Sequence, residues 1–268
     1  MENIQGNHSK FTFELNYIND NTIIISTGKI ASTFIWNNLS HPSNRLECRY
    51  DMYTNKFIIS NKNNANEFID KIFESEKINK IIVVRNPYER LISSIQHQIA
   101  YTIDEHSGLR HCVNNLHIDV KQKDNELIDK LDNQYQNNQI TDDILSIQLL
   151  EHVPYITTKI IDSLFYTNKM ILDEWVSDIH FGNFYFGMNE ITDKIVTTNT
   201  NLLNIKNLNS FLELHLGNLK SHVQNKSSYD KKNFSFSSLN NISQYVYYLY
   251  LQIEKIGITN LEKKYQYL

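Results

Sequence analysis

Short apolar runs alternate along this chain with segments in which apolar positions recur every three or four residues. Thr22–Ile25 and Lys80–Val84 are β-branched runs that predict buried strands of a parallel sheet. A helical period follows each run, over Ile30–Leu39 and over Pro87–Tyr101. Two strand-to-helix units in succession predict an α/β fold, a P-loop-like domain whose mainly parallel sheet is flanked by helices.

The same criteria predict the remaining elements. An edge strand is expected near Phe11–Leu15, a short strand at Lys56–Ser60 and a third sheet strand at Asn183–Met188. Helices are expected over Asn63–Glu76, Thr141–His152, residues 190–216 and Ser237–Ile256.

Two polar stretches interrupt these elements. Residues 1–20 form a polar lead-in, and the Asn/Gln/Asp-rich tract 104–140 is predicted to be a mobile insertion on the substrate side. Because no internal repeat or linker is visible, residues 1–268 are expected to form a single domain.

Composition narrows the class of protein. A chain of 268 residues with 41% hydrophobic residues can bury a substantial core. The net charge of −4 gives no broad basic face, so nucleic acid is not an expected partner. Two cysteines, no signal-peptide core and no apolar window of membrane-spanning length favour a cytoplasmic protein with no membrane partner. Oligomeric state leaves no signal in the sequence.

The first chemical signal lies between the first strand and its helix. The strand breaks at Ser26–Gly28, and a helix N-terminus with free backbone N–H groups favours an anion. Lys29 adds a positive charge there, and Ser32 and Thr33 add hydroxyls. This pattern predicts a cradle for a phosphate-like group. It is not a Walker motif, because position 23 is Ile where that motif requires Gly.

The second signal lies at the next strand-to-helix junction. Asn86 is a good N-cap, with Pro87 and Glu89 at the positions that a helix start favours. Arg85 therefore leaves the end of a strand, and Ser93 follows two helical turns later. Arg85 and Ser93 can grip one phosphate between them, since a planar guanidinium matches phosphate oxygens. Two anion sites suit a nucleotide with phosphates at both its 5′ and 3′ ends.

Each of these residues also has a purely structural interpretation. Lys29 can be a solvated surface lysine, Arg85 can bind backbone carbonyls and Ser93 can be a packed hydroxyl. Arg90, in the same segment, is expected to be an exposed helix residue paired with a nearby carboxylate.

The segments Lys29–Thr33 (Lys-Ile-Ala-Ser-Thr) and Arg85–Ser93 (Arg-Asn-Pro-Tyr-Glu-Arg-Leu-Ile-Ser) resemble a known pair of motifs. They are similar to the two nucleotide-binding motifs of sulfotransferases that use 3′-phosphoadenosine 5′-phosphosulfate (PAPS). The likeness is to the carbohydrate branch, the relatives of the chondroitin, dermatan and uronyl 2-O-sulfotransferases, and spans about residues 22–268. Glu151–Pro154 is similar to a family His-x-x-Pro segment, with Val153 where the family has Trp. His222–Asn225, Tyr229 and the terminal helix resemble the family's late loop and closing helix.

The resemblance implies a sulfotransferase fold and the transfer of a sulfuryl group from PAPS, without a metal, to a hydroxyl or amine. The acceptor would be a small molecule or a glycan, with a carbohydrate favoured. Lys29 would neutralise charge on the leaving phosphate. The residues implied to bind the nucleotide are Gly28, Lys29, Ile30, Ala31, Ser32, Thr33, Phe34, Arg85, Ser93, Asn225 and Lys226.

A general base must accept the proton of the acceptor. His152 is the first candidate, because it lies in the His-x-x-Pro-like segment, and His41, Glu47 and His97 are the alternatives. Two other functions stay open. One is a P-loop-like nucleotide kinase, which would need Mg²⁺ ligands and a Walker glycine pattern. The other is a catalytically inactive, sulfotransferase-like nucleotide-binding module.

Overall fold

The computed structural model describes residues 10–39, 44–51, 54–60, 62–166, 183–220 and 241–268. The chain divides into two compact units. Unit 1 comprises the described residues of Met1–Arg90, Leu172–Gln224 and Leu249–Leu268. Unit 2 comprises those of Leu91–Ile171 and Asn225–Tyr248. The prediction of a single domain over residues 1–268 stays a prediction.

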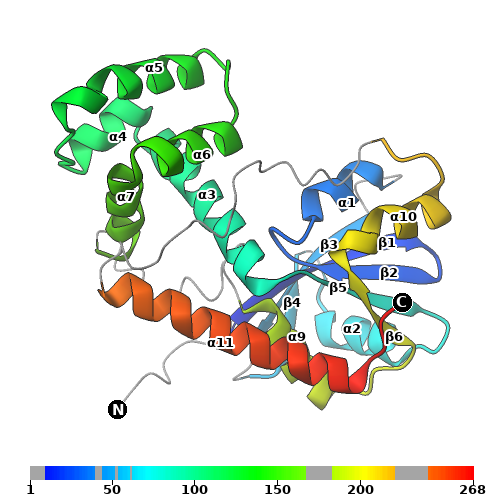
Figure 1. Ribbon diagram of the computed structural model, residues 1–268. Helices are drawn as coiled ribbons and strands as arrows, with labels where there is room; N and C mark the ends of the chain where they lie inside the picture. The colour runs from blue at the N-terminus through cyan, green and yellow to red at the C-terminus, as the bar shows by residue number, and fades with distance from the viewer. Residues whose placement is uncertain (1–9, 40–43, 52–53, 61, 167–182, 221–240) are drawn as a thin grey trace. The chain divides into compact units, whose positions relative to one another are not determined.

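Unit 1 is built on a six-stranded mixed sheet with the strand order β4-β3-β1-β2-β5-β6 (Figure 1). Strands β2, β5 and β6 are parallel neighbours, whereas β1, β3 and β4 pair in antiparallel fashion. The α/β class is therefore confirmed, but the sheet is mixed rather than mainly parallel. The strands are β1 (Lys10–Asn19), β2 (Thr22–Ser26), β3 (Arg45–Asp51), β4 (Lys56–Ile59), β5 (Asn79–Val84) and β6 (Thr200–Asn204).

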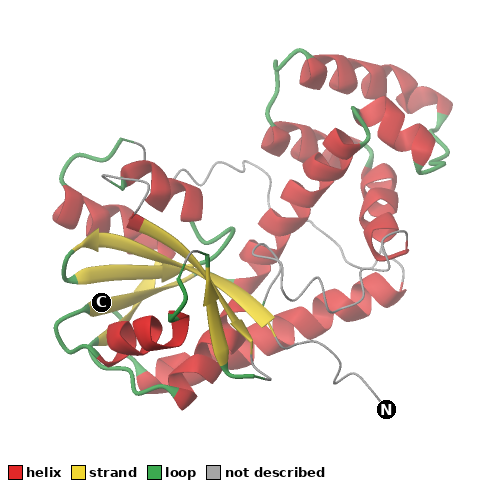
Figure 2. Ribbon diagram, turned by 180° about the vertical axis from the view of Figure 1, so that it is seen from behind, coloured by secondary structure: helices red, strands yellow, loops and turns green. Residues whose placement is uncertain are grey.

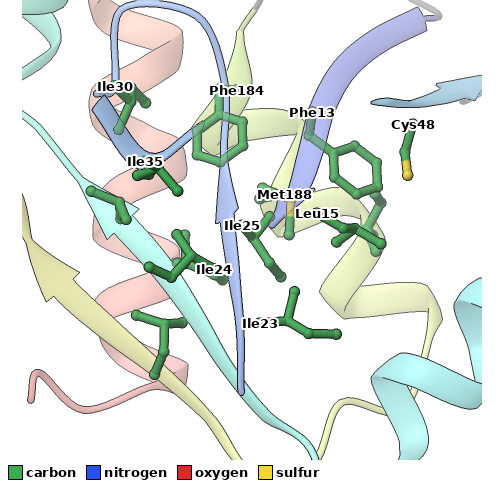
Figure 3. Packing of buried hydrophobic residues seen from close by; sticks show 14 of the residues in the cluster. Phe13, Leu15, Ile23, Ile24, Ile25, Ile30, Ile35, Cys48, Phe184 and Met188 are labelled. Atoms are coloured by element: carbon green, nitrogen blue, oxygen red, sulfur yellow. The ribbon is translucent and has the colours of Figure 1, made fainter. Parts of the chain in front are cut away.

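Helices cover both faces of this sheet, as Figures 1 and 2 show. In the described part of unit 1, the helices that lie wholly within the unit are α1 (Ser32–Asn38), α2 (Ala65–Glu74), α9 (Phe184–Lys194) and α10 (Leu208–Leu216), with the 3-10 helix η3 (Ile205–Asn207). Helices α1 and α10 lie on one face and α2 and α9 on the other. Figure 3 shows Met188 of α9 beside Leu15 and Ile25, all fully buried. The β-branched run that predicted β2 is buried because both of its faces are covered.

A buried lysine ends helix α2. Lys80 is the second residue of β5, and its ammonium donates to the carbonyl oxygens of Ile72, Phe73 and Ser75 at 3.3, 3.1 and 2.6 Å. These are carbonyls of the last helical turn and the segment after it, which lack partners within the helix. Burial lowers the pKa of Lys80 to about 8. Lys80 therefore satisfies the carbonyl oxygens at the end of α2. It lies near the start of β5, at the end of the sheet opposite the loop that follows β2.

Helix α11 (Asn241–Lys264) begins in unit 2 and continues into unit 1, where it approaches the start of α9 closely. A Cβ atom on Gly257 would lie 2.3 Å from the backbone nitrogen of Phe186 and 2.4 Å from the carbonyl carbon of Tyr185. Only a residue without a side chain fits there. Lys264 fastens the end of α11 to α9 through Asp193 at 2.6 Å and Asn189 Oδ1 at 2.7 Å.

Unit 2 contains helices only, among the residues that the structure describes. Helix α3 (Pro87–Glu105) starts in unit 1 and enters unit 2 at Leu91. It is followed by α4 (Leu109–Asn115), η2 (Gln122–Asp124), α5 (Asn125–Gln136), α6 (Asp142–His152) and α7 (Pro154–Tyr166). The Tyr135 hydroxyl joins α5 to α3 and α6, 2.8 Å from an Asp104 oxygen and 3.0 Å from an Asp142 oxygen. In the described parts of the chain, no helix combines the length and the apolar character needed to cross a bilayer.

Several predicted elements are wrong. Asn183–Met188 is not a strand but the start of α9, and the third parallel strand is β6, inside a segment expected to be helical. The strand at Phe11–Leu15 is not at the edge, since β1 lies between β3 and β2. The sequence also missed β3. Tract 104–140 forms helices α4 and α5 with buried Leu109 and Leu131 rather than a mobile loop, because its apolar positions, although sparse, recur at helical spacing.

Gly257→Ala should destabilise the protein, although Ala is normally the better helix former. Its methyl group would overlap the backbone of α9, so the free energy of unfolding should fall by about 1–3 kcal/mol. Urea unfolding followed by circular dichroism measures this. Thr259→Ala, at an exposed position of the same helix, is the matched control and should be neutral or stabilising. Stabilisation by Gly257→Ala would contradict the packing described here.

Candidate functional site

The segment between β2 and α1, Thr27–Ala31, is called the anion loop below. It contains a tight turn in which the Ile30 N–H donates to the Thr27 carbonyl at 3.1 Å. Lys29 and Ala31 have φ angles of 62° and 56°, in the left-handed region that residues with a side chain avoid. Each such residue costs on the order of 1 kcal/mol. For this reason α1 begins at Ser32, two residues later than the start at Ile30 that the sequence predicted.

The start of α1 is left without the usual protein caps. Its N-cap is Ala31, which makes no side-chain hydrogen bond to the helix, and the first turn has no acidic residue. Ser32 is half-buried and Thr33 is exposed, whereas Gly28, Ile30 and Phe34 are buried. The loop is thus strained, and its helix start carries hydroxyls and no competing carboxylate.

The second motif lies beside this loop. Because β2 and β5 are parallel neighbours, the segments that follow them leave the same edge of the sheet. Arg85 follows β5, and its Nη1 donates to the Lys29 carbonyl oxygen at 2.6 Å. The Arg85 amide donates to the hydroxyl of Tyr185 at 2.7 Å, which holds the start of α3 against α9. Asn86 caps α3 as predicted, accepting from the Tyr88 amide at 2.9 Å.

Arg85 is largely buried, with 16% of its side chain exposed. Burial lowers the pKa of its guanidinium, but arginine stays charged at neutral pH. Its Nε lies 3.9 Å from a Glu89 oxygen, one turn along the chain. Arg85 therefore makes the carbonyl contact that its structural interpretation predicted, and it also places its positive charge beside Lys29.

Arg90 is not an exposed helix residue, as the sequence had suggested, but is completely buried. Its Nε donates to the Gly28 carbonyl oxygen at 3.3 Å, and its Nη1 donates to the Tyr250 hydroxyl at 2.7 Å. Nη1 also lies 3.6 Å from Glu254 Oε2, and both side chains are fully buried. Arg85 and Arg90 thus bind consecutive carbonyls of the anion loop.

Glu254 connects Arg90 to helix α9. Its Oε2 accepts from the Tyr185 amide at 3.3 Å, so it caps the start of α9 from another helix. Its Oε1 has no hydrogen-bond partner among the described residues. Burial raises the pKa of Glu254 to about 7, although Arg90 and the backbone amides oppose the shift.

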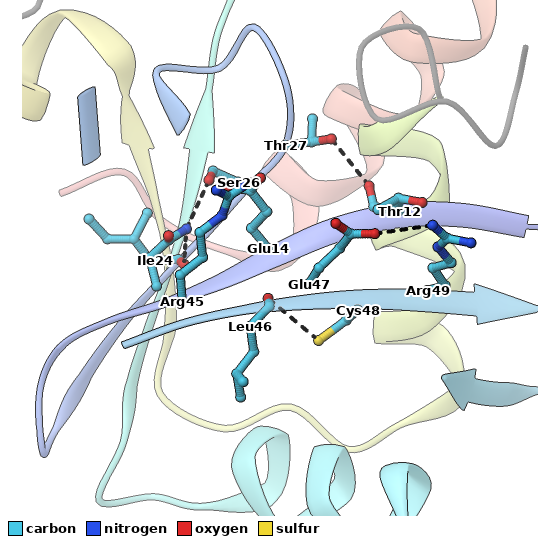
Figure 4. A network of polar contacts seen from close by, with 11 residues as sticks. Thr12, Glu14, Ile24, Ser26, Thr27, Arg45, Leu46, Glu47, Cys48 and Arg49 are labelled. Carbon is cyan, nitrogen blue, oxygen red and sulfur yellow. Dashed lines mark hydrogen bonds and ion pairs between the residues drawn. The ribbon is translucent and has the colours of Figure 1, made fainter. Parts of the chain in front are cut away.

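Polar side chains of β1 and β3 gather beside the end of β2, as Figure 4 shows. Glu14 is buried and ion-paired with Arg45, and it faces Ser26 of β2 on one side and Glu47 of β3 on the other. Burial raises the pKa of Glu14, while Arg45 opposes the shift. The Thr27 hydroxyl donates to the Thr12 carbonyl at 3.2 Å, so the first residue of the anion loop is bound to β1.

The candidate bases separate between the two units. Glu47 lies on β3 in unit 1, half-exposed, with Arg49 at 3.3 Å. His152 is the exposed last residue of α6, and His97 is half-buried on α3, both in unit 2. His41 lies outside the described residues. Glu47 is therefore the described candidate that shares a unit with Lys29.

Other predicted site residues are not brought to the loop by what the structure describes. Ser93 is half-buried on α3 and belongs to unit 2, so its grip on the same phosphate as Arg85 stays a prediction. Asn225 and Lys226 lie outside the described residues. In the described residues no group of three or more His, Cys, Asp or Glu side chains is arranged to hold a metal ion, and the metal-free site stays a prediction.

Four buried residues that surround the anion loop were not predicted from the sequence to belong to the site: Arg90, Glu254, Glu14 and Tyr185. Arg90 was visible in the second motif, but nothing local showed that it is buried. Glu254 had a weak signal, since it falls at helical spacing from Tyr247 and Tyr250, on the side of α11 that is buried. Glu14 and Tyr185 had none, because their partners are distant in the chain.

Comparison with protein-family models, with curated proteins and with solved structures found no match for this chain.

The free energy of unfolding should vary with pH, because Glu254 binds a proton more tightly in the folded protein than in the unfolded chain. Between pH 4.5 and about 7 the folded protein holds this proton and the unfolded chain has lost it. Stability should therefore fall as pH rises through this window, by on the order of 3 kcal/mol at most. Glu254→Gln, which keeps an acceptor for the Tyr185 amide, should flatten this part of the profile in urea titrations. Glu126→Gln, at an exposed position in unit 2, is the control. An equally steep profile in Glu254→Gln would contradict the assignment.

Proposed function

We propose that this protein is a sulfotransferase that moves a sulfuryl group from PAPS to a hydroxyl or amine acceptor. The observation that best supports the proposal is the hydrogen bond between Arg85 Nη1 and the Lys29 carbonyl, 2.6 Å long. It joins the two motifs at one edge of the sheet, which a nucleotide phosphorylated at both ends requires. Had the motifs lain on different edges, one such nucleotide could not have reached both.

The proposed step is an in-line displacement at sulfur. The bond from sulfur to the bridging oxygen of the 5′-phosphate breaks, a bond from sulfur to the acceptor oxygen or nitrogen forms, and the acceptor proton passes to a base. Adenosine 3′,5′-bisphosphate leaves with the bonding electrons. Lys29 neutralises the charge that develops on its 5′-phosphate, by analogy with phosphoryl transfer. The loop amides and the hydroxyls of Ser32 and Thr33 hold the same group, and Arg85 holds the 3′-phosphate.

Glu47 is the base that the geometry favours. Its carboxylate is half-exposed, so an acceptor can reach it, and it lies two strands from Ser26, the residue before the anion loop. Two strand spacings amount to about 10 Å, a distance that an acceptor and a sulfonate can fill together. The acceptor is proposed to be a small molecule or a carbohydrate.

Isothermal titration with adenosine 3′,5′-bisphosphate, without Mg²⁺, tests the nucleotide site. The intact protein should bind with a micromolar or lower Kd. Lys29→Ala and Arg85→Ala should each weaken binding by roughly 10- to 100-fold, because each removes a charged contact to a phosphate. Lys71→Ala and Lys77→Ala, at exposed positions of unit 1, are the matched controls.

Two results would overturn this site. Failure of the intact protein to bind the bisphosphate would remove the PAPS proposal, and tight Mg²⁺-dependent binding of ATP instead would favour the kinase. Thermal melts of the four variants show whether a loss of affinity only reflects a loss of fold.

Turnover separates the active enzyme from an inactive binding module. With sulfur-labelled PAPS and a panel of carbohydrate and small-molecule acceptors, Lys29→Ala should transfer no detectable label. Glu47→Gln should lower kcat by roughly 100-fold, within the usual range for loss of a general base, and leave bisphosphate affinity unchanged. His152→Asn is the comparison. If it abolishes transfer while Glu47→Gln does not, the base lies in unit 2.

A further inference from the structure

The side chain of Arg90 contacts two segments of unit 1, the anion loop and helix α11. Nε binds the Gly28 carbonyl at 3.3 Å, and Nη1 binds the Tyr250 hydroxyl at 2.7 Å. Glu254 Oε2 lies 3.6 Å from Nη1. None of these atoms can exchange its partner for water without opening the core, because Arg90 and Glu254 are completely buried and Tyr250 nearly so.

By binding the Gly28 carbonyl oxygen, Arg90 fixes the direction of the Lys29 N–H, which belongs to the same peptide unit. A peptide unit is planar and trans, so its C=O and N–H point in opposite directions. With the Gly28 oxygen turned toward Arg90, the Lys29 N–H must point the other way. Arg85 does the same for the next peptide, since it holds the Lys29 carbonyl and the Ile30 N–H turns to the Thr27 oxygen at 3.1 Å.

This arrangement accounts for the left-handed φ of Lys29, which is 62°. A conformation that costs on the order of 1 kcal/mol persists only when neighbouring groups enforce it. Two guanidinium groups that pull consecutive carbonyls inward supply that constraint. Their effect is to turn the Lys29 N–H away from Arg90.

The residues that hold Arg90 in place belong to α11. Tyr250 and Glu254 are one turn apart on α11, and both lie at Nη1 of Arg90, whereas Nε of Arg90 binds the loop. Glu254 is itself held by the Tyr185 amide of α9, and the Tyr185 hydroxyl receives the Arg85 amide. The Arg85 backbone is therefore held by α9 and the Arg90 side chain by α11, and Glu254 joins these two helices.

We propose that Arg90 is a positioning residue for the anion loop. Tyr250 and Glu254 of α11 hold its guanidinium in the place that this role requires. Arg90 touches no phosphate in this scheme. It fixes the direction in which Lys29 presents its amide and ammonium to the anion. The inference rests on the proposed function for the identity of that anion, but not for the conformation of the loop.

Tyr250→Phe tests this without emptying the core, since it removes only the hydroxyl that anchors Nη1. Arg90→Lys is the second variant, which keeps the charge and loses the fork that reaches Gly28 and Tyr250 together. Tyr247→Phe, one turn earlier in α11 and equally buried, is the matched control. Two quantities are measured for each folded variant. They are the ¹H–¹⁵N shifts of the Lys29 and Ile30 amides and the Kd for adenosine 3′,5′-bisphosphate.

We expect Tyr250→Phe to move the Lys29 amide resonance and weaken bisphosphate binding by roughly 3- to 10-fold, and Arg90→Lys to weaken it by roughly 10-fold or more. Tyr247→Phe should lower the melting temperature without either effect. Wild-type Lys29 shifts and wild-type affinity in folded Tyr250→Phe would overturn the inference, whether or not Arg90→Lys folds. If the intact protein binds no bisphosphate, the proposed function fails. A moved Lys29 resonance in Tyr250→Phe would then still support the positioning role of Arg90.

Discussion

The parallel pairing of β2 with β5 is the constraint on which the rest of this site depends. Four residues of each strand are in register, from Thr22 opposite Asn79 to Ile25 opposite Ile82. Parallel strands end at the same edge of a sheet, so the anion loop and Arg85 emerge side by side. A single hydrogen bond then suffices to join two segments that are 56 residues apart in the chain.

The loop is held from the inside by charges that the protein has buried. Arg90 and Glu254 are both fully enclosed, and desolvation of such a pair usually offsets much of its attraction. A pair of this kind adds little stability, but it is specific about geometry, because every donor must meet an acceptor. Gly257 allows α11 to come close enough to α9 for Glu254 to reach the Tyr185 amide. The helix packing and the loop conformation are therefore parts of one arrangement.

The local elements of the site were predictable, and their surroundings were not. The β-branched run at Thr22–Ile25 and the N-cap Asn86 are signals within a few residues of the structures that they specify, and both predictions are confirmed. The aromatic run at Asn183–Met188 looked like a strand, since Phe and Tyr favour strands. In the fold Gly187 packs against the ring of Phe11, and Glu254 caps the first turn, so tertiary contacts make this segment a helix.

By itself, the sequence determined the two strand-to-helix junctions, the positions of Lys29 and Arg85 at their ends, and the α/β class. Each depends on hydrophobic period and capping chemistry between residues close together in the chain. The tertiary structure alone decided that the two junctions are neighbours, that β1 and β3 extend the sheet in antiparallel fashion, and that Arg90 is buried. Arg90 meets a hydroxyl 160 residues away, and no periodicity or local propensity can indicate a partner at that separation.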